Sequence, residues 1–368
     1  MSLRLLIAGG GTGGHVFPAL AVAEALRARK DGSQVLFVGT ERGFEARAVP
    51  AAGFDIAFIR ISGLKRVGLL GTVRTLLRLP LSLLSSWSIL SRFQPQAVLG
   101  VGGYASGPVL LAAWLKRLPS AVAEQNSVPG FTNRVLGKLV RAVFGSFEHS
   151  ARYFDARRFR VVGNPVRAAL AEQAREERPA AATDTVRVLV LGGSQGARPL
   201  NEKLPQGFAL AMQRGLKLEI THQAGEADAE RARQVYAGQG VPATVHSFID
   251  DMAAAYGAAD LVVGRAGATT CAELTALGIP SILIPFPQAA DDHQTLNARA
   301  LADAGAAVVI PQHELDAESL STALHALCGD GAGRLGQMRE AARSLGRPEA
   351  AHQLVDALCA LARGDKPW

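Results

Sequence analysis

Short apolar runs alternate with longer helix-like stretches along the whole chain. The strands predicted in the first half span residues 3–8, 34–38, 97–101, 121–124, 142–144 and 160–162. Stretches such as residues 17–29 lie between them and predict helices. Because a helix that follows each strand carries the chain back to the same end of the sheet, this alternation predicts parallel strands.

The second half repeats the scheme after a pause. The strands predicted there span residues 186–191, 216–222, 243–247, 261–264, 281–284 and 307–310. Helices dominate from residue 317, and a last helix is expected at about 348–363. The pause at residues 163–167, followed by a stretch rich in Ala, Arg, Glu and Pro, indicates an interdomain connection. We therefore expect two α/β domains, residues 1–164 and 165–345.

Two glycine-rich loops occupy matching places in the halves. Residues 9–14 and 192–197 each follow an apolar run directly and precede a helix-like stretch. Glycine permits a close approach of backbone to ligand, and the helix that follows presents N–H groups to an anion. The pair predicts two nucleotide-binding-type domains that face one cleft. The first loop also fits G-x-G-x-x-G, with Glu41 as a ribose acid, but a dehydrogenase would not need the second loop.

Amino-acid composition indicates which kinds of molecule the protein could bind and which compartment it suits. The 368 residues are 48% hydrophobic and 19% charged, as in ordinary folded proteins, and the net charge of +7 favours an anionic partner. Nucleic acid is disfavoured because aromatic residues do not interleave with the cations. The three cysteines are scattered and predict neither disulfides nor a metal site, which fits a reducing cytosol.

Two segments bear on the membrane. No secretory signal opens the chain, and residues 93–115 lack charge but are broken by Gly and Pro, which predicts strand, loop and helix rather than a span. Residues 64–87 mix leucines and Trp87 with cations and no acid, as in segments that adsorb to anionic bilayers. The alternative is a buried helix pair with solvated arginines. The predicted membrane patch is Lys65, Arg66, Leu69, Leu70, Arg74, Leu77, Arg78, Leu81, Leu84 and Trp87.

Polar residues gather at the ends of predicted strands in the second half. Thr269 and Thr270 follow the strand at 261–264, where a helix start could hold a phosphate, and Glu273 lies one turn further on. Simple helix capping explains the same spacing. Gln294 and Asn297 follow the next strand and could bind sugar hydroxyls, and no His or Asp cluster has the spacing of a metal site.

His15 begins the helix after the first glycine loop. The positive end of a helix disfavours the cationic imidazole, so a histidine there tends to stay neutral and able to accept a proton. This makes His15 a candidate general base. A capping or supporting histidine is the alternative.

Together these motifs resemble the MurG family of bacterial glycosyltransferases. The stretches that resemble it lie between residues 5 and 298 and read GGGTGGHVFPALAVAEAL, RISGLK, VLGVGGYASGP, EQNSVPGFTN, VVGNPVR, VLGGSQGAR, FIDDMAAAY, GRAGATTCAELTALGIP and QTLNA. The resemblance implies a GT-B fold, in which two Rossmann-like domains with parallel sheets face a central cleft. It also implies that the last helix, about residues 346–368, packs back on the N-terminal domain.

The resemblance implies an inverting, metal-independent transfer, without a cofactor, at the cytoplasmic face of the inner membrane. The donor is UDP-N-acetylglucosamine and the acceptor is undecaprenyl-pyrophosphoryl-N-acetylmuramyl-pentapeptide (lipid I), which becomes the peptidoglycan precursor lipid II. Carried over from the family, the acceptor-side residues are Gly13, Gly14, His15, Tyr104 and Asn126. The donor-binding residues are Thr12, Gly13, Gly14, Asn126, Arg167, Ser194, Ile249, Arg265, Ala268, Thr269, Thr270, Glu273, Gln294 and Asn297. The resemblance implies that Arg167 and the Ile249 backbone contact uracil and that Glu273 contacts the ribose. It assigns the diphosphate to Ser194, the Ala268–Thr270 amides and Arg265.

Three alternatives remain at this point. Two are enzymes of the same architecture, namely a glycosyltransferase with another lipid acceptor, such as diacylglycerol, and a UDP-sugar epimerase. The third is a peripheral membrane module that binds a nucleotide-sugar without chemistry.

Overall fold

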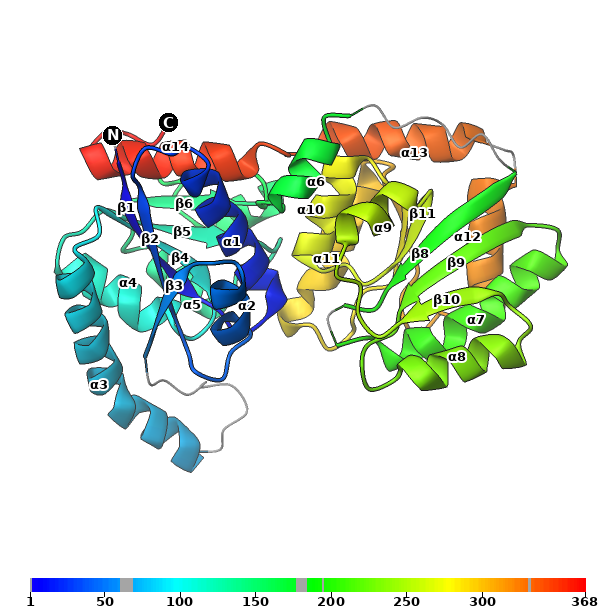
Figure 1. The fold of residues 1–368 in the computed structure, drawn as a ribbon, viewed down its shortest axis with the longest axis horizontal. Coiled ribbons are helices and arrows are strands. Elements are labelled where there is room, and N and C mark those ends of the chain that lie inside the picture. Colours follow the sequence, from blue (N-terminus) through cyan, green and yellow to red (C-terminus); the bar gives the residue numbers. More distant parts are fainter. Residues whose placement is uncertain (1, 60–68, 177–183, 194, 330–331) are drawn as a thin grey trace. The chain divides into compact units, whose positions relative to one another are not determined.

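The computed structural model describes residues 2–59, 69–176, 184–193, 195–329 and 332–368, with residues 69–79 and 332 described by their backbone alone. The chain forms two compact units. Unit 1 comprises Met1–Ala168 and Glu349–Trp368, and unit 2 comprises Ala169–Pro348. Each unit is built around one parallel sheet (Figure 1).

The sheet of unit 1 has seven strands in the order β3-β2-β1-β4-β5-β6-β7. All neighbouring strands pair in parallel, which confirms the sequence prediction. The strand order reverses between β1 and β4, and ligands of open α/β sheets bind where the order reverses. The strands are β1 (Arg4–Gly9), β2 (Gln34–Gly39), β3 (Asp55–Phe58), β4 (Ala97–Gly102), β5 (Ser120–Glu124), β6 (Ala142–Gly145) and β7 (Phe159–Val161).

Helices cover both faces of this sheet. Helices α1 (Gly13–Arg27), α2 (Glu45–Ala51) and α14 (Ala350–Arg363) share a core with one face. Helix α14 packs against α1 although more than 300 residues separate them (Figure 1). Helices α3 (Leu69–Phe93), α4 (Ser106–Leu115) and α5 (Phe131–Leu136) cover the other face. The 3₁₀ helix η1 (Glu148–Tyr153) joins β6 to β7.

The sheet of unit 2 has six parallel strands in the order β10-β9-β8-β11-β12-β13. The order again reverses beside the strand that precedes a glycine loop, here between β8 and β11. The strands are β8 (Thr185–Leu191), β9 (Lys217–Gln223), β10 (Ala243–His246), β11 (Leu261–Gly264), β12 (Ser281–Leu283) and β13 (Ala307–Val309).

The helices of unit 2 also fall on two sides. Helices α7 (Arg198–Gln213), α8 (Ala229–Gly238) and α12 (Ala317–Cys328) share the main core of the unit. Helices α9 (Met252–Ala258), α10 (Ala268–Leu277) and α11 (His293–Asp303) lie on the opposite side of the sheet (Figure 1). Helix α6 (Ala168–Gln173) begins the unit, η2 (Ala290–Asp292) precedes α11, and α13 (Ala332–Leu345) packs against α10 and α12.

The uncharged segment at residues 93–115 forms the end of α3, β4, a loop and α4, as predicted. Its apolar character follows from burial, because β4 is buried along its whole length and a doubly covered parallel strand is apolar on both faces. Within the described ranges, no helix has both the length and the apolar composition that crossing a bilayer requires.

Candidate active site

The first glycine loop leaves β1 at the point where the strand order of unit 1 reverses. Gly11 has φ +95°, and its N–H donates to Glu45 Oε2 at 2.6 Å. The Glu45 carboxylate is buried at the start of α2, where Oε1 also accepts from the N–H and the hydroxyl of Thr40, both at 2.9 Å. Glu45 thus holds the loop in place. Glu41, the possible ribose acid of a dinucleotide site, is exposed and makes none of these contacts. We did not predict this role of Glu45.

His15 lies in the first turn of α1 and is half-buried. Its imidazole rests on Gly102 at the end of β4, where an added Cβ would lie 2.8 Å from Cε1 and 3.0 Å from Nδ1. On another side, His15 Nδ1 lies 3.0 Å from Oε1 of Gln125, which follows β5. The ring of this candidate base therefore lies where the ends of β1, β4 and β5 meet.

A buried acid lies beside His15. Glu124, at the end of β5, accepts from the Asn126 N–H at 2.9 Å and from Asn133 Nδ2 at 2.7 Å. Burial raises the pKa of the Glu124 carboxyl above its ordinary value, while these hydrogen bonds and the field of His15 act in the opposite direction. This network fixes the position of Asn126.

The residues that the sequence predicted around His15 fall at one edge of the sheet of unit 1. Thr12, Gly13 and Gly14 follow β1, Tyr104 follows β4, and Asn126 follows β5. Thr12 precedes α1 without capping it through its side chain, and Tyr104 is 48% exposed. Parallel strands end at the same edge of a sheet, so these residues share the edge at which ligands bind.

The second glycine loop connects β8 to α7, and its residue Ser194 lies outside the described residues. Gln223, at the end of β9, donates from Nε2 to the Gly193 carbonyl at 3.2 Å and accepts at Oε1 from the Ile249 N–H at 3.0 Å. One side chain therefore joins the glycine loop to the segment predicted to contact uracil. We did not predict Gln223, whose only signal in the sequence is its place at a strand end.

Helix α10 begins at the carboxyl end of β11, as predicted. Its N-cap residue, Gly267, has no side chain to cap the helix, so the first turn presents the N–H groups of Ala268, Thr269 and Thr270 at this edge. Glu273 is buried farther along α10, and the Tyr256 hydroxyl of α9 donates to its Oε2 at 2.8 Å. A fixed carboxylate thus lies in the same helix whose start was predicted to hold a phosphate.

Arg265 joins the loop before α10 to the chain after β12. Its Nη1 donates to the carbonyls of Ile284 and Pro285 at 3.1 Å, and Nη2 donates to Gln312 Oε1 at 2.6 Å. Burial lowers the pKa of the guanidinium to about 10. Both Nη atoms are therefore engaged within unit 2, so the predicted diphosphate contact remains a prediction.

Two predicted sugar-binding amides also support backbone. Gln294 Oε1 accepts from the Phe286 N–H at 3.0 Å, and the fully buried Asn297 donates from Nδ2 to the Ala266 carbonyl at 3.2 Å. They hold the loops after β12 and β11, and their contact with sugar hydroxyls stays a prediction. Across the part of the chain that the structure describes, no group of three or more His, Cys, Asp or Glu residues could hold a metal ion.

Arg167, predicted to meet uracil, precedes α6 and belongs to unit 1 by its packing. Its guanidinium lies 5.2 Å from the centre of the Phe17 ring on α1. Its charge acts to lower the pKa of Glu24, although burial raises that pKa overall. Arg167 thus lies against α1, the helix that carries His15 in its first turn.

The predicted membrane patch falls largely on α3. Lys65 and Arg66 lie outside the described residues, and Leu69, Leu70, Arg74, Leu77 and Arg78 are described by backbone alone, within α3. Leu81, Leu84 and Trp87 are 65%, 66% and 41% exposed. Ser82, Ser86 and Leu90 are buried, so α3 has one face on unit 1 and the other toward solvent.

The neighbouring helix α4 extends this exposed apolar face. Trp114 is 46% exposed, and Lys116 Nζ lies 4.1 Å from the centre of the Trp87 ring while it donates to Ser91 Oγ at 3.0 Å. Helices α3 and α4 pack against each other. Aromatic and cationic groups therefore occur together on adjacent helices.

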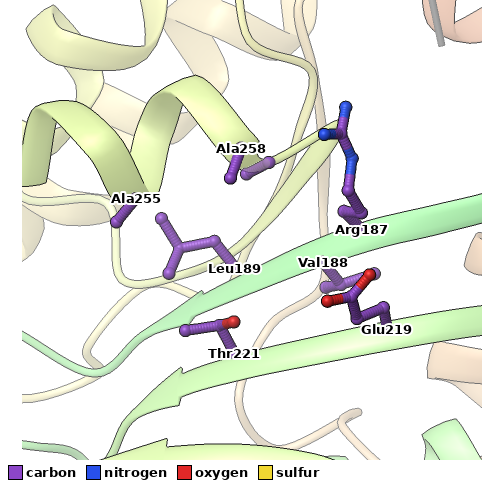
Figure 2. Close-up of a pocket in the computed structure, with 8 residues that line it drawn as sticks. Arg187, Val188, Leu189, Glu219, Thr221, Ala255 and Ala258 are labelled. Atoms are coloured by element: carbon purple, nitrogen blue, oxygen red, sulfur yellow. The ribbon is translucent and has the colours of Figure 1, made fainter.

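Unit 2 also has a shallow depression that lies away from the strand ends (Figure 2). Its residues come from the middle of β8 and β9 and from α9, namely Arg187, Val188, Leu189, Glu219, Thr221, Ala255, Ala258 and Ala259. The Arg187 guanidinium is paired with Asp260 at 2.8 Å. None of these lining residues belongs to the glycine loop or to the start of α10.

Comparison with known proteins agrees with this arrangement. Residues 5–145 match the glycosyltransferase family 28 N-terminal domain, and residues 187–354 match the family 28 C-terminal domain. The UDP-N-acetylglucosamine--N-acetylmuramyl-(pentapeptide) pyrophosphoryl-undecaprenol N-acetylglucosamine transferase of Anaeromyxobacter sp. (strain K) is 49% identical over 361 residues. That alignment covers 98% of this chain and 94% of the relative.

One solved structure is similar to this chain in both sequence and fold, and another is similar in fold alone. MurG of Acinetobacter baumannii is 33% identical, with a TM-score of 0.77, and the match covers 97% of this chain and 99% of that one. A UDP-N-acetylglucosamine 2-epimerase has a TM-score of 0.70 at 13% identity, with 99% and 97% of the two chains covered. The second likeness shows the fold alone. The first confirms the GT-B-like fold expected from the sequence.

Proposed function

The chain belongs to glycosyltransferase family 28, and we infer from this that it transfers N-acetylglucosamine from UDP-N-acetylglucosamine to undecaprenyl-pyrophosphoryl-N-acetylmuramyl-pentapeptide. The product is lipid II, the lipid-linked precursor of peptidoglycan. The observation that carries this assignment is the 49% identity, over nearly the full length of both chains, to transferases of this activity.

We assign the donor to the strand ends of unit 2. The start of α10 at Ala268–Thr270 suits a diphosphate, because N–H groups and the positive end of a helix stabilise an anion. Glu273, held by Tyr256, suits a ribose hydroxyl because a carboxylate accepts hydrogen bonds from both ribose oxygens. Ile249, tied to the glycine loop by Gln223, suits uracil.

We assign the reacting hydroxyl of the acceptor to the His15 edge of unit 1. The 4-hydroxyl of N-acetylmuramic acid attacks the anomeric carbon, its proton passes to His15, and the bond from that carbon to the UDP oxygen breaks. UDP leaves with the electron pair of that bond, and attack from the opposite side inverts the configuration to give a β-1,4 linkage. Charge that grows on the leaving diphosphate is stabilised by preorganised N–H groups at the start of α10.

Replacement of His15 tests this assignment. His15→Ala is expected to lower kcat by about 10²–10⁴-fold, the usual contribution of a general base, and to leave the Kd for UDP-N-acetylglucosamine near that of the wild type. A radiolabelled transfer assay to lipid I measures kcat, and calorimetry measures Kd. Normal turnover in His15→Ala would remove it from the base role, and activity lost in EDTA and restored by Mg²⁺ would contradict transfer without a metal.

The two enzymatic alternatives are separated by omitting or changing the acceptor. An epimerase would convert UDP-N-acetylglucosamine without any acceptor, whereas a transferase releases UDP only when lipid I is added. Diacylglycerol in place of lipid I tests the other lipid acceptor. A module without chemistry would release no UDP under any of these conditions.

We further propose that α3 and α4 bind the anionic surface of the inner membrane, where the lipid acceptor resides. Leu81, Leu84, Trp87 and Trp114 supply exposed apolar area, and Lys116 supplies a cation next to Trp87. Apolar insertion and electrostatic attraction combine in such patches, and each basic residue near the surface contributes about 1 kcal/mol.

Vesicle sedimentation tests the membrane proposal. The wild type is expected to sediment with vesicles that contain phosphatidylglycerol more than with pure phosphatidylcholine, and high salt is expected to weaken binding. The double variant Leu81→Ser, Leu84→Ser should sediment less. Phe248→Ser removes an exposed apolar side chain of unit 2, 47% exposed, and serves as the matched control. Equal sedimentation of the double variant and the wild type would contradict the proposal.

A further inference from the structure

We propose that Gln125 is a positioning residue that holds His15 in the tautomer with its proton on Nδ1, so that Nε2 is the atom that accepts the acceptor's proton. The inference rests on the proposed transferase function for its meaning. Its evidence is the pair of contacts that Gln125 makes with Ala123 and His15. Gln125 itself touches no reacting atom, so its role is to orient His15.

The first step is the orientation of the Gln125 amide. Gln125 is 1% exposed, and its Nε2 lies 3.2 Å from the Ala123 carbonyl oxygen of β5. A carbonyl oxygen only accepts hydrogen bonds, so it must face the NH₂ group of the amide. The opposite orientation would set two acceptor oxygens against each other in a buried place, which is costly. The Ala123 carbonyl therefore fixes Oε1 as the atom that faces His15.

The second step is the tautomer of the imidazole. Gln125 Oε1 lies 3.0 Å from His15 Nδ1 and can only accept a hydrogen bond, so Nδ1 must donate and must carry the proton. A neutral imidazole with its proton on Nδ1 has its lone pair on Nε2. The bond that the ring makes at one nitrogen thus decides which nitrogen is the base.

The third step is the position of the ring. The imidazole lies on Gly102, which has φ +96° and no Cβ, and this leaves room for the ring between β4 and Gln125, the residue after β5. Glu124 is the titratable neighbour that interacts electrostatically with His15, and its two oxygens accept from Asn126 and Asn133. The hydrogen-bond partner of Nδ1 is the amide of Gln125 rather than this carboxylate. The arrangement resembles the orienting partner of a catalytic histidine, with a neutral amide in place of an acid.

Nitrogen-15 NMR of the ring reports the tautomer without any assay of activity. In the full-length protein labelled at histidine, the signals of His15 are identified among the eight histidines by their loss in His15→Gln. We expect the wild type at neutral pH to show a protonated Nδ1 and an unprotonated Nε2. Gln125→Met removes the acceptor while it keeps the length of the side chain, and we expect the proton to move toward Nε2.

Kinetics provide the second measurement. Gln125→Met is expected to lower kcat by about 10-fold to 100-fold, less than full loss of a general base, with the Kd for UDP-N-acetylglucosamine unchanged. Gln125→Glu restores an acceptor and is expected to keep the proton on Nδ1. Its acid limb in the pH profile of kcat/KM should move to higher pH, because a carboxylate beside the ring stabilises the imidazolium.

Gln96→Met is the matched control. Gln96 also lies in unit 1, but its Oε1 accepts from the Arg4 N–H at 2.8 Å, at the start of β1 and therefore at the far edge of the sheet. This variant should change neither the His15 signals nor kcat. It separates the specific effect of Gln125 from the general cost of replacing a glutamine.

The outcomes separate this inference from the proposed function. A wild type with its proton on Nε2, or a Gln125→Met variant that keeps it on Nδ1, overturns the role of Gln125. A wild type with the expected tautomer but no transfer to lipid I overturns the proposed function and leaves the tautomer assignment standing. The expected tautomer, its loss in Gln125→Met and its recovery in Gln125→Glu together support the inference.

Discussion

The hydroxyl of Tyr256 donates a 2.8 Å hydrogen bond to the carboxylate of Glu273 and so joins α9 to α10 inside unit 2. Both residues are buried, which holds the carboxylate in one orientation. Tyr256→Phe removes the donor and keeps the ring. Because a hydrogen bond to a charged group contributes about 1.5–3 kcal/mol, we expect the Kd for UDP, measured by calorimetry, to rise by roughly 10-fold to 100-fold.

The same substitution elsewhere in unit 2 is the control for this prediction. The Tyr236 hydroxyl lies 2.9 Å from His222 Nδ1, and among the residues that the structure describes it has no hydrogen bond to a predicted donor residue. Tyr236→Phe should therefore lower stability and leave UDP affinity unchanged. If the two variants weaken UDP binding equally, Glu273 is not oriented by Tyr256 for the donor.

Gln223 supports the donor site from a second direction. Gln223→Leu breaks the bonds to the Gly193 carbonyl and to the Ile249 N–H at once, so the glycine loop and the uracil segment lose their common support. We expect UDP affinity to fall by roughly thirtyfold, since the two lost bonds contribute about 1 kcal/mol each. Gln223→Glu retains an acceptor for Ile249 and should bind UDP with intermediate affinity. Unchanged affinity in Gln223→Leu would show that the two segments keep their positions independently.

The sequence predicts the sheets well because their strands are buried on both faces. Residues 261–264 form β11 with the predicted bounds, and most other predicted strands differ from the structure by one or two residues. The exception is β3 (Asp55–Phe58), which was not predicted. This strand pairs with β2 and is the edge strand of the described sheet. It is half-exposed, so its four residues lack the continuous apolar run of the other strands.

The residues of the candidate site that could be predicted have a local signal in the sequence, and those that could not be predicted act through contacts with distant residues. The two glycine loops, His15 and the start of α10 were predicted because each follows a strand directly in the sequence. Glu45, Gln125 and Gln223 were not predicted as supports. Their side chains bind backbone or ring atoms that lie 34, 110 and 30 positions away, and no local pattern records such proximity.

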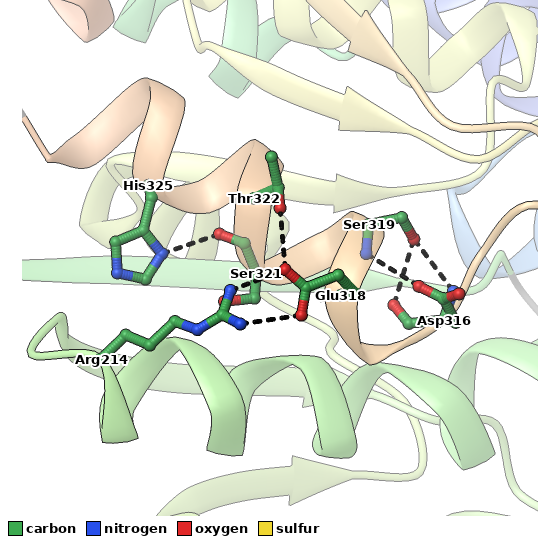
Figure 3. A network of polar contacts seen from close by, with 7 residues as sticks. All are labelled: Arg214, Asp316, Glu318, Ser319, Ser321, Thr322 and His325. Atoms are coloured by element: carbon green, nitrogen blue, oxygen red, sulfur yellow. Dashed lines mark hydrogen bonds and ion pairs between the residues drawn. The ribbon is translucent and has the colours of Figure 1, made fainter.

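The capping box of α12 gives a prediction on stability and pH (Figure 3). Asp316 accepts from the Ser319 N–H at 2.8 Å, and the Asp316 N–H donates to Ser319 Oγ at 3.0 Å. These bonds hold the pKa of the Asp316 carboxyl below its ordinary value. A carboxyl whose pKa is lower in the folded state stabilises the protein above its unfolded pKa, and this stabilisation is lost as pH falls through the folded pKa.

Asp316→Asn keeps an N-cap side chain but cannot titrate, which makes it the matched variant. At neutral pH the wild type should have the higher urea midpoint for unit 2. The difference should shrink as the pH is lowered to about 3.5, below the ordinary pKa of an aspartate. Asp316→Ala also loses the cap and should have the lowest midpoint at neutral pH. A difference between wild type and Asp316→Asn that grows on acidification would contradict the assigned sign.

The space that Gly102 leaves for His15 gives a prediction on turnover. In Gly102→Ala the new Cβ would lie 2.8 Å from His15 Cε1, and φ +96° is unfavourable for alanine, so the imidazole must move away from its place. We expect kcat to fall by roughly 100-fold while the Kd for UDP stays unchanged, because unit 2 is untouched. Gly107→Ala is the control, since the nearest described neighbour of its new Cβ is Thr132 Cγ2 at 3.9 Å and a helix such as α4 accepts alanine readily. Equal turnover in the two variants would mean that the position of the His15 ring does not limit the transfer.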